Sequence, residues 1–210
     1  MSRSILVLAP HTDDAELGCG GAIAKAVEAG NRVAVVAFSG AEESLPKGSS
    51  PDRLHAEMRA SLKVLGVSDD AIFIEKFPVR NFDRHRQAIL DKMIEYRTRF
   101  APDLVFAPAS QDVHQDHGTI HLEMLRAFRR SSIWCYELPW NQISAETTGF
   151  VVLDEKHVEA KFRALQCYES QVELERPYFK RELIFGMAAM RGVQAFSRYA
   201  EAFQALRTLA

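Results

Sequence analysis

Two short clusters of histidine and carboxylate side chains are the residues of this chain best suited to chemistry. The first cluster is His11, Asp13 and Asp14, which follow the apolar run Ile5–Ala9. A catalytic zinc ion commonly takes three protein ligands, with His nitrogens and carboxylate oxygens among them, and keeps one position for water. His11 and Asp14 can reach one ion from a tight loop. Asp13 would then lie beside the metal without binding it, where a general base is needed.

The same stretch also suits the start of a helix. Thr12, Asp13 or Asp14 could each accept a hydrogen bond from a free backbone N–H group as an N-cap. The first cluster alone therefore does not distinguish between a metal site and a helix cap.

The second cluster follows the apolar run Leu104–Ala107 and has the sequence DVHQDH. His117 can supply a third metal ligand, and His114 points near the same centre. Asp116 or Asp112 can orient an imidazole and keep it protonated. A polar helix start is again the alternative. Two clusters that each follow a strand favour one shared site over two unrelated caps.

His121 lies four residues after His117, a spacing that places two ligands on one face of a helix. No Glu follows His117 directly, so the H-E-x-x-H pattern is absent. We therefore expect His121 to support the site from behind or to pack on the helix.

Strand and helix signals alternate along the chain. Apolar runs predict strands at Ile5–Ala9, Arg32–Phe38, Ala71–Phe77, Leu104–Ala107, Ile133–Leu138 and Phe150–Leu153. Amphipathic segments predict helices at Gly20–Ala29, Pro51–Leu65, Asp83–Phe100, Gly118–Arg129, Glu155–Tyr168 and roughly Phe179–Leu206. This order predicts right-handed βαβ crossovers in a Rossmann-like three-layer α/β/α sandwich with a mainly parallel sheet. Ligands bind such folds beyond the carboxyl ends of the strands, where both clusters lie.

The composition is that of an ordinary globular protein, with 47% apolar and 26% charged residues, and we expect one domain over residues 1–210. The 26 basic and 28 acidic residues nearly balance, which gives no electrostatic case for binding nucleic acid or an anionic membrane. Three widely spaced cysteines predict a reducing compartment without structural disulfides. No signal peptide or membrane-spanning run is evident, so a cytoplasmic protein is expected.

The run Gly18–Gly21 supports a competing hypothesis. Leu-Gly-Cys-Gly resembles the glycine loop of S-adenosylmethionine-dependent methyltransferases, so a methyltransferase or another nucleotide-binding protein is an alternative. In those proteins, however, the glycines directly follow the first strand, whereas here His11 to Glu16 intervene. Gly20 and Gly21 are better explained by close packing of a helix, and Cys19 by packing rather than metal ligation. A metal-binding module without catalysis is a further alternative, which the spare acid Asp13 disfavours.

Together, APHTDDAELGCGG and DVHQDH resemble the signature stretches of the LmbE/PIG-L family of zinc-dependent N-deacetylases. Glu57 with Leu65-Gly66-Val67, and Tyr168 to Gln171, also resemble later parts of that family, so the likeness extends to about residue 170. The first motif usually reads His-Pro-Asp-Asp. Thr12 stands here in place of the proline, which changes the stiffness of the loop but not its ligands.

The resemblance implies a hydrolase that removes an N-acyl group, usually acetyl, from an amino sugar or its conjugate, with a zinc-bound water as nucleophile. Other divalent ions such as Fe²⁺ are alternatives to zinc. It implies that His11, Asp14 and His117 are the metal ligands. Asp13 would be the general base, and His114 would stabilise the oxyanion with Asp116 behind it.

Residues that bind the substrate are less defined by the sequence. Arg53 lies near the position of a sugar- or phosphate-contacting arginine of the family, one place off the usual spacing. Asn81 and Asp83 follow the third predicted strand, where an acceptor for sugar hydroxyls is expected, and Trp140 could stack on a sugar face. Solvated loop residues, and a packed core edge for Trp140, are the alternatives. The apolar residues from Tyr178 to Leu206 would either cover the site or form a homo-oligomer contact.

Overall fold

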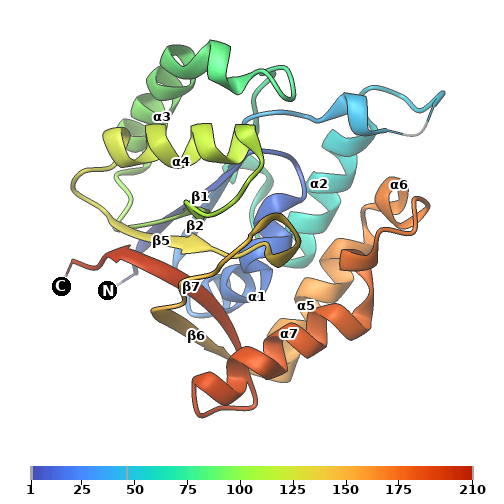
Figure 1. Cartoon of the computed structure of the whole chain (residues 1–210), viewed down its shortest axis with the longest axis vertical. Coiled ribbons are helices and arrows are strands. Elements are labelled where there is room, and N and C mark those ends of the chain that lie inside the picture. The colour runs from blue at the N-terminus through green and yellow to red at the C-terminus, as the bar shows by residue number, and fades with distance from the viewer. Residues whose placement is uncertain (1, 46, 210) are drawn as a thin grey trace.

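The computed structural model describes residues 2–45 and 47–209, which form one seven-stranded sheet flanked by helices (Figure 1). The strands are β1 Ser4–Ala9, β2 Arg32–Ala37, β3 Ile72–Ile74, β4 Leu104–Pro108, β5 Ser132–Tyr136, β6 Gly149–Leu153 and β7 Tyr199–Arg207. Their order in the sheet is β3-β2-β1-β4-β5-β7-β6. The strands β1 to β5 pair in parallel, and β7 is antiparallel to both β5 and β6. The predicted α/β class with a mainly parallel sheet is confirmed.

Helices cover both faces of the sheet. One face carries α3 Arg86–Phe100 and α4 Gln115–Ala127 (Figure 1). The other carries α1 Asp14–Glu28, α2 Arg53–Val64, α5 Glu155–Gln166 and α7 Arg181–Gln194, with the short α6 Glu169–Val172 beside them. Short 3₁₀ turns join these elements at Glu42–Ser44, Asp69–Ala71, Phe82–His85, Pro139–Asn141 and Pro177–Phe179. In the described part of the chain, no helix has both the length and the apolar character needed to cross a membrane.

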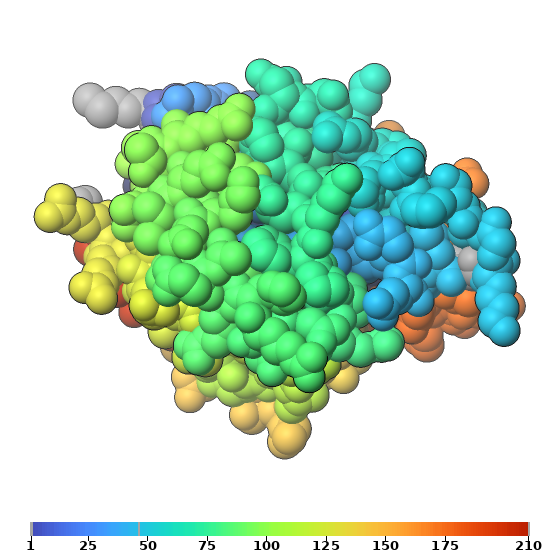
Figure 2. Space-filling model, turned by 90° about the horizontal axis from the view of Figure 1, so that it is seen from above, coloured from blue at the N-terminus to red at the C-terminus, as the bar shows by residue number. Residues whose placement is uncertain are grey.

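Each face of the sheet has its own apolar core, so the fold has three layers. Successive residues of β1 point to opposite sides: Val7 packs in the core under α1 and α2, and Leu6 packs in the core under α3 and α4. A strand buried on both faces reads as a continuous apolar run, which is how β1 and β2 were predicted. Figure 2 shows α3 and the preceding loop covering the middle of one face, with residues 42–45 and 47–50 projecting beside them.

The predicted C-terminal helix was wrong in its second half. Helix α7 ends at Gln194, and the chain turns back to form β7 between β5 and β6. The alanines, glutamate and glutamine of YAEAFQALR favour a helix by intrinsic propensity. Tertiary packing overrides this preference, because six consecutive residues from Tyr199 are buried between two neighbouring strands and two layers of helices.

The predicted start of the first helix at Gly20 was also wrong, because α1 begins at Asp14 and carries the glycines in its interior. The helix is kinked at Cys19, whose φ and ψ are −145° and 26°. A Cβ atom on Gly18 would lie 2.2 Å from the ring of Tyr136. The glycines therefore allow close packing, as predicted.

The kink leaves two backbone N–H groups of α1 to be satisfied from outside the helix. Those of Gly21 and Ala22 donate to the carboxylate of Glu201 on β7, at 3.0 and 2.7 Å. A nucleotide-binding glycine loop uses such groups to hold phosphate. Because Glu201 already occupies them, the methyltransferase or nucleotide-binding alternative has no support in this structure.

Candidate metal centre and substrate cavity

The two polar clusters meet at the carboxyl ends of neighbouring strands. β1 pairs with β4, so the residues that follow these strands lie side by side. His11 and Asp14 come from the loop after β1 and the first turn of α1. His114 and His117 come from the N-terminus of α4, after β4. The sequence prediction that the clusters form one site agrees with this arrangement.

Three ligand atoms from these clusters form a nearly equilateral triangle. Asp14 Oδ2 lies 3.2 Å from His11 Nδ1 and 3.3 Å from His117 Nε2. His11 Nδ1 and His117 Nε2 are 3.3 Å apart. Atoms that bind a tetrahedral zinc ion at about 2.0–2.1 Å are separated by about 3.3 Å. The triangle thus has the size of one face of a zinc coordination tetrahedron.

Each of the two histidines has a carboxylate behind it. Asp116 Oδ2 lies 3.1 Å from His11 Nε2, and Asp112 Oδ2 lies 2.7 Å from His117 Nδ1. Metal-binding histidines usually donate their second ring N–H to such a partner, which fixes the tautomer and directs a lone pair to the metal. The carboxylates therefore hold the two imidazoles in the tautomers that present His11 Nδ1 and His117 Nε2 to an ion.

The carboxylates of this centre need a nearby positive charge to balance them. Burial lowers the pKa of His117, but the charge of Asp14 and hydrogen bonds to Asp112 and Asp14 outweigh burial and raise it to about 10. Burial also raises the pKa of Asp14, yet the charge of His117 and the hydrogen bond to His11 hold it well below its usual range. Without a metal, protons on the imidazoles balance these acids. A divalent ion would provide the same balance, and the donor set suits zinc.

His114 lies against this triangle and has a different environment. One of its ring nitrogens is within 4.8 Å of those of His11 and His117. Its Nδ1 accepts a hydrogen bond from the backbone N–H of Asp116 at 3.2 Å, which makes His114 the N-cap of α4. Burial and the two neighbouring imidazoles lower its pKa. With Nδ1 as acceptor, Nε2 carries the proton of the neutral ring and can donate it in a hydrogen bond.

The family resemblance implied that Asp116 lies behind His114, but the structure places it elsewhere. Its carboxylate turns away and contacts His11, and it also accepts the backbone N–H groups of Arg80 at 2.6 Å and Phe82 at 3.2 Å. It therefore connects the loop after β3 to His11. The helix-start alternative holds in part for the second cluster, since His114 caps α4.

Asp13 occupies the N-cap position of α1, but its carboxylate forms no capping hydrogen bond. Together with Asp14 it lines a cavity. Burial and the charge of Asp14 raise the pKa of Asp13 to about 6. A carboxylate with a pKa near the working pH is an efficient general base, so the side chain is free and suited to accept a proton.

His121 packs behind the site, as one of its two predicted roles required. Its Nδ1 lies 3.0 Å from the carbonyl oxygen of Pro108, and the ring is buried. Its partner is the end of β4, so it fixes the strand that leads into the second cluster.

A cavity of about 360 Å³ opens onto the metal centre and has the size of a small-molecule site. Its polar lining includes Asp13, Ser44, Arg80, His114, Asn141, Gln171 and Arg176. Its aromatic wall is a stacked pair, Trp140 and Tyr178, with ring centroids 4.6 Å apart and planes 11° from parallel. Such a pair offers a flat face to a sugar ring.

Of the four residues predicted to bind substrate, the structure brings only Trp140 to this cavity. Arg53 donates instead to Glu57 and Glu173, at 3.0 and 2.7 Å. Asn81 donates to the backbone of Val79, and Asp83 is exposed to solvent.

Sequence reasoning missed Arg176, named Arg80 only as a cation that could meet a sugar phosphate, and placed Tyr178 only at the start of a segment that could cover the site. Arg176 and Tyr178 follow the Tyr168–Gln171 stretch by only a few residues, so a cation and an aromatic ring beside a family motif were the available signal. Arg80 has a left-handed backbone conformation (φ 63°). Such a conformation is usually indicated by a glycine, and none stands at this position.

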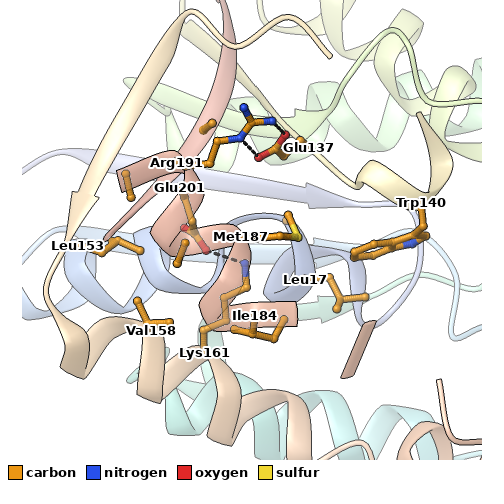
Figure 3. A pocket seen from close by; sticks show the side chains of 14 residues that line it. Leu17, Glu137, Trp140, Leu153, Val158, Lys161, Ile184, Met187, Arg191 and Glu201 are labelled. Carbon is orange, nitrogen blue, oxygen red and sulfur yellow. Dashed lines mark hydrogen bonds and ion pairs between the residues drawn. The ribbon is translucent and has the colours of Figure 1, made fainter. Parts of the chain in front are cut away.

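A second, smaller cavity shares Leu17 and Trp140 with the first. Figure 3 shows Lys161 of α5 reaching Glu201 of β7, and Arg191 of α7 paired with Glu137, with Trp140 and Leu17 at the other end. Its volume of about 20 Å³ holds a water molecule but no sugar. Its charged groups already have partners, so the larger cavity is the candidate substrate site.

Comparisons with known proteins agree with this arrangement. The family model described as PIG-L, GlcNAc-PI de-N-acetylase, matches residues 6–128, which is more than half of the chain and contains both clusters. YaiS of Escherichia coli strain K12, named an uncharacterized deacetylase, is 26% identical over 178 residues, which cover 80% of this chain and 91% of YaiS.

Solved structures share the fold at lower identity. The N,N'-diacetylchitobiose deacetylase of Pyrococcus horikoshii superposes with a TM-score of 0.80 at 20% identity and covers 97% of this chain and 83% of its own. GalB, the 4-carboxy-2-hydroxymuconate hydratase of Pseudomonas putida KT2440, has a TM-score of 0.78 at 21% identity over 100% and 98% of the two chains. The fold thus carries more than one reaction, and the activity has to be argued from the site.

Proposed function

This chain belongs to the PIG-L family, and from that premise we propose that it is a metal-dependent N-deacetylase. Its substrate would be an N-acyl amino sugar or an amino-sugar conjugate, with acetyl as the usual acyl group. The observation that carries the proposal is the triangle of His11 Nδ1, Asp14 Oδ2 and His117 Nε2 with the unpaired carboxylate of Asp13 beside it. A structural metal site needs no such spare acid, so the arrangement favours catalysis over a passive metal-binding module.

His11, Asp14 and His117 would hold a zinc ion or a similar divalent ion. When bound, this ion supplies a Lewis acid for the acyl carbonyl and lowers the pKa of water to about 7. Asp13 accepts a proton from the attacking water at its carboxylate. It then returns that proton to the departing amine, so that one residue acts first as base and then as acid.

His114 donates its Nε2–H to the carbonyl oxygen as negative charge develops there. Because its pKa is lowered, the donor at neutral pH is the neutral imidazole. This refines the expectation of a protonated His114. Trp140 and Tyr178 orient the sugar ring against an outer face of their stacked pair.

The test measures acetate release from a panel of N-acetyl sugars and sugar conjugates, with and without a chelator. We expect activity that disappears on chelation and returns with zinc. Asp13→Asn should keep about one metal ion per chain and lose about 10²–10⁴-fold in kcat. Asp91→Asn, an exposed acid on α3, is the matched control and should keep full activity.

Acetate release by metal-free protein, or full activity of Asp13→Asn, would contradict the mechanism. Stoichiometric metal without hydrolysis of any N-acyl sugar would instead favour the passive metal-binding module.

A further inference from the structure

Arg176 is a partly buried arginine that forms no ion pair with a carboxylate in the described part of the chain. Its side chain lines the large cavity, and its Nε atom is shielded from solvent without a hydrogen-bond partner among residues 2–45 and 47–209. Arg53 and Arg191, by contrast, each bind carboxylates directly. A shielded N–H group without a hydrogen-bond acceptor is costly in the folded protein. Arg176 therefore has unused capacity to bind an anion in the cavity.

A second cation lines the same cavity. The side chain of Arg80 has one ion pair within the described residues, a 4.0 Å contact with the exposed Glu43. Its backbone has a φ of 63°, a conformation that is unfavourable for a residue with a Cβ atom. The N–H of Arg80 is held there by the carboxylate of Asp116 at 2.6 Å. The strained turn thus places Arg80, whose side chain is largely exposed, in the lining of the cavity that opens onto the metal centre.

The acids of the cavity do not neutralise these arginines. Asp14 belongs to the metal triangle, and Asp13 forms no ion pair within 4.0 Å in the described part of the chain. Arg176 and Tyr178 lie two residues apart, with Pro177 between them, so a cation and half of the aromatic pair come from one short segment. A sugar ring against Trp140 and Tyr178 would have its substituents within the reach of Arg176.

We infer that the substrate is an anionic N-acyl amino sugar, whose phosphate or carboxylate group is bound by Arg176 with Arg80 nearby. This inference rests on the proposed function. The planar guanidinium group presents paired N–H donors that match the two oxygens of a carboxylate or phosphate. Arg176 is thereby a specificity-determining residue that selects charged over neutral substrates.

The test compares kcat/KM for N-acetylglucosamine, its 1-phosphate, its 6-phosphate and N-acetylmuramic acid. The wild-type enzyme should prefer one of the charged sugars to the neutral one, and the phosphate and carboxylate substrates identify which anion is used. Arg176→Gln should lose about 10–100-fold in kcat/KM on that substrate, mainly through KM. It should change the neutral sugar by less than about twofold, and Arg176→Lys should restore part of the preference.

Arg181→Gln is the matched control, because Arg181 is paired with Glu159 outside the cavity. Equal losses on neutral and charged sugars would overturn the inference. A wild-type enzyme without preference for any charged sugar would overturn it as well.

Calorimetric binding of glucosamine 6-phosphate, glucosamine 1-phosphate, muramic acid and glucosamine separates this inference from the proposed function. A preference for one of the charged ligands that disappears in Arg176→Gln would support the anion site even if no sugar were hydrolysed. Indistinguishable binding of charged and neutral ligands would refute the site even if deacetylation were established.

Discussion

At the scale of single residues, protons and a metal ion compete for the same lone pairs. His117 has a pKa of about 10 in the metal-free protein, so it carries a proton at pH 7 that must leave before its Nε2 can bind an ion. We expect zinc binding at pH 7 to release about one proton from His117, and zinc affinity to rise with pH until about 10. Calorimetry in buffers of different ionisation enthalpy measures the proton count. Binding without proton release would contradict the assignment of His117.

The carboxylates behind the histidines give a second prediction at this scale. Asp112→Asn and Asp116→Asn should each weaken zinc binding about 10–100-fold, because each removes the anion that orients a metal-binding imidazole. Competition with a chromophoric chelator measures this change. If Asp116 supported His114 rather than His11, Asp116→Asn would keep its zinc affinity and lose only turnover.

The sequence predicted the residues of the candidate metal centre because each cluster is local. His11 to Asp14 and Asp112 to His117 each follow one strand, and parallel neighbouring strands bring their ends together. The partner of each carboxylate was not predictable, because it depends on how side chains turn in space. Arg176 was missed for a similar reason, since its burial and its lack of a partner exist only in the folded chain.

At the scale of elements, a buried ion pair fixes the kink of α1. Glu201 of β7 accepts two backbone N–H groups of that helix and also binds Lys161 of α5 at 2.7 Å. Glu201→Gln would leave the buried ammonium group of Lys161 without a counter-charge. We expect this variant to lose about 3–5 kcal/mol in the free energy of unfolding, measured with urea.

The control for this experiment is Glu159→Gln, which breaks the more exposed pair with Arg181 and should cost less than about 1 kcal/mol. Adding Lys161→Met to Glu201→Gln should recover part of the stability, because no charged group then remains unpaired. A Glu201→Gln protein as stable as the wild type would show that the pair does not hold the kink.

The wrong predictions for the start of α1 and for β7 arise from contacts between residues far apart in the sequence, as in this ion pair. The sequence patterns located β1 to β6 because each is a short run of mainly apolar residues. The glycines before Ala22 were taken as a helix start, since nothing local indicates that Glu201 stabilises a kinked helix there. β7 was predicted as a helix because its alanines have high helix propensity. In the folded protein these small residues fit the narrow space between two neighbouring strands.

At the scale of the whole molecule, a buried acid makes stability depend on pH. Glu16, in the first turn of α1, lies 2.9 Å from the hydroxyl of Tyr168, which in turn donates to the carbonyl of Thr12. Burial raises the pKa of Glu16 to about 8, although hydrogen bonds oppose this shift. The folded protein therefore holds a neutral carboxyl group at pH 7.

The direction of this pH dependence follows from the pKa of Glu16 in the unfolded and folded states. The unfolded chain has a Glu pKa of about 4.3. The contribution of Glu16 to stability is thus complete below about pH 4.3 and is lost as the pH rises through about 8. We expect the wild type, relative to Glu16→Gln, to lose on the order of 3 kcal/mol in unfolding free energy between pH 5 and pH 9. Parallel pH profiles of urea unfolding for the two proteins would contradict a buried neutral Glu16.

β7 also determines the order in which this protein can be assembled during synthesis. β6 pairs with β7 and with no other strand among the described residues, and Glu201 of β7 reaches Gly21, which is 180 positions earlier in the chain. A growing chain therefore has unpaired edges on both β5 and β6 until residues 199–207 have left the ribosome, and such edges invite pairing with other chains. The helix that begins beside the triangle of ligand atoms therefore receives support from a residue that is translated 180 positions after Gly21.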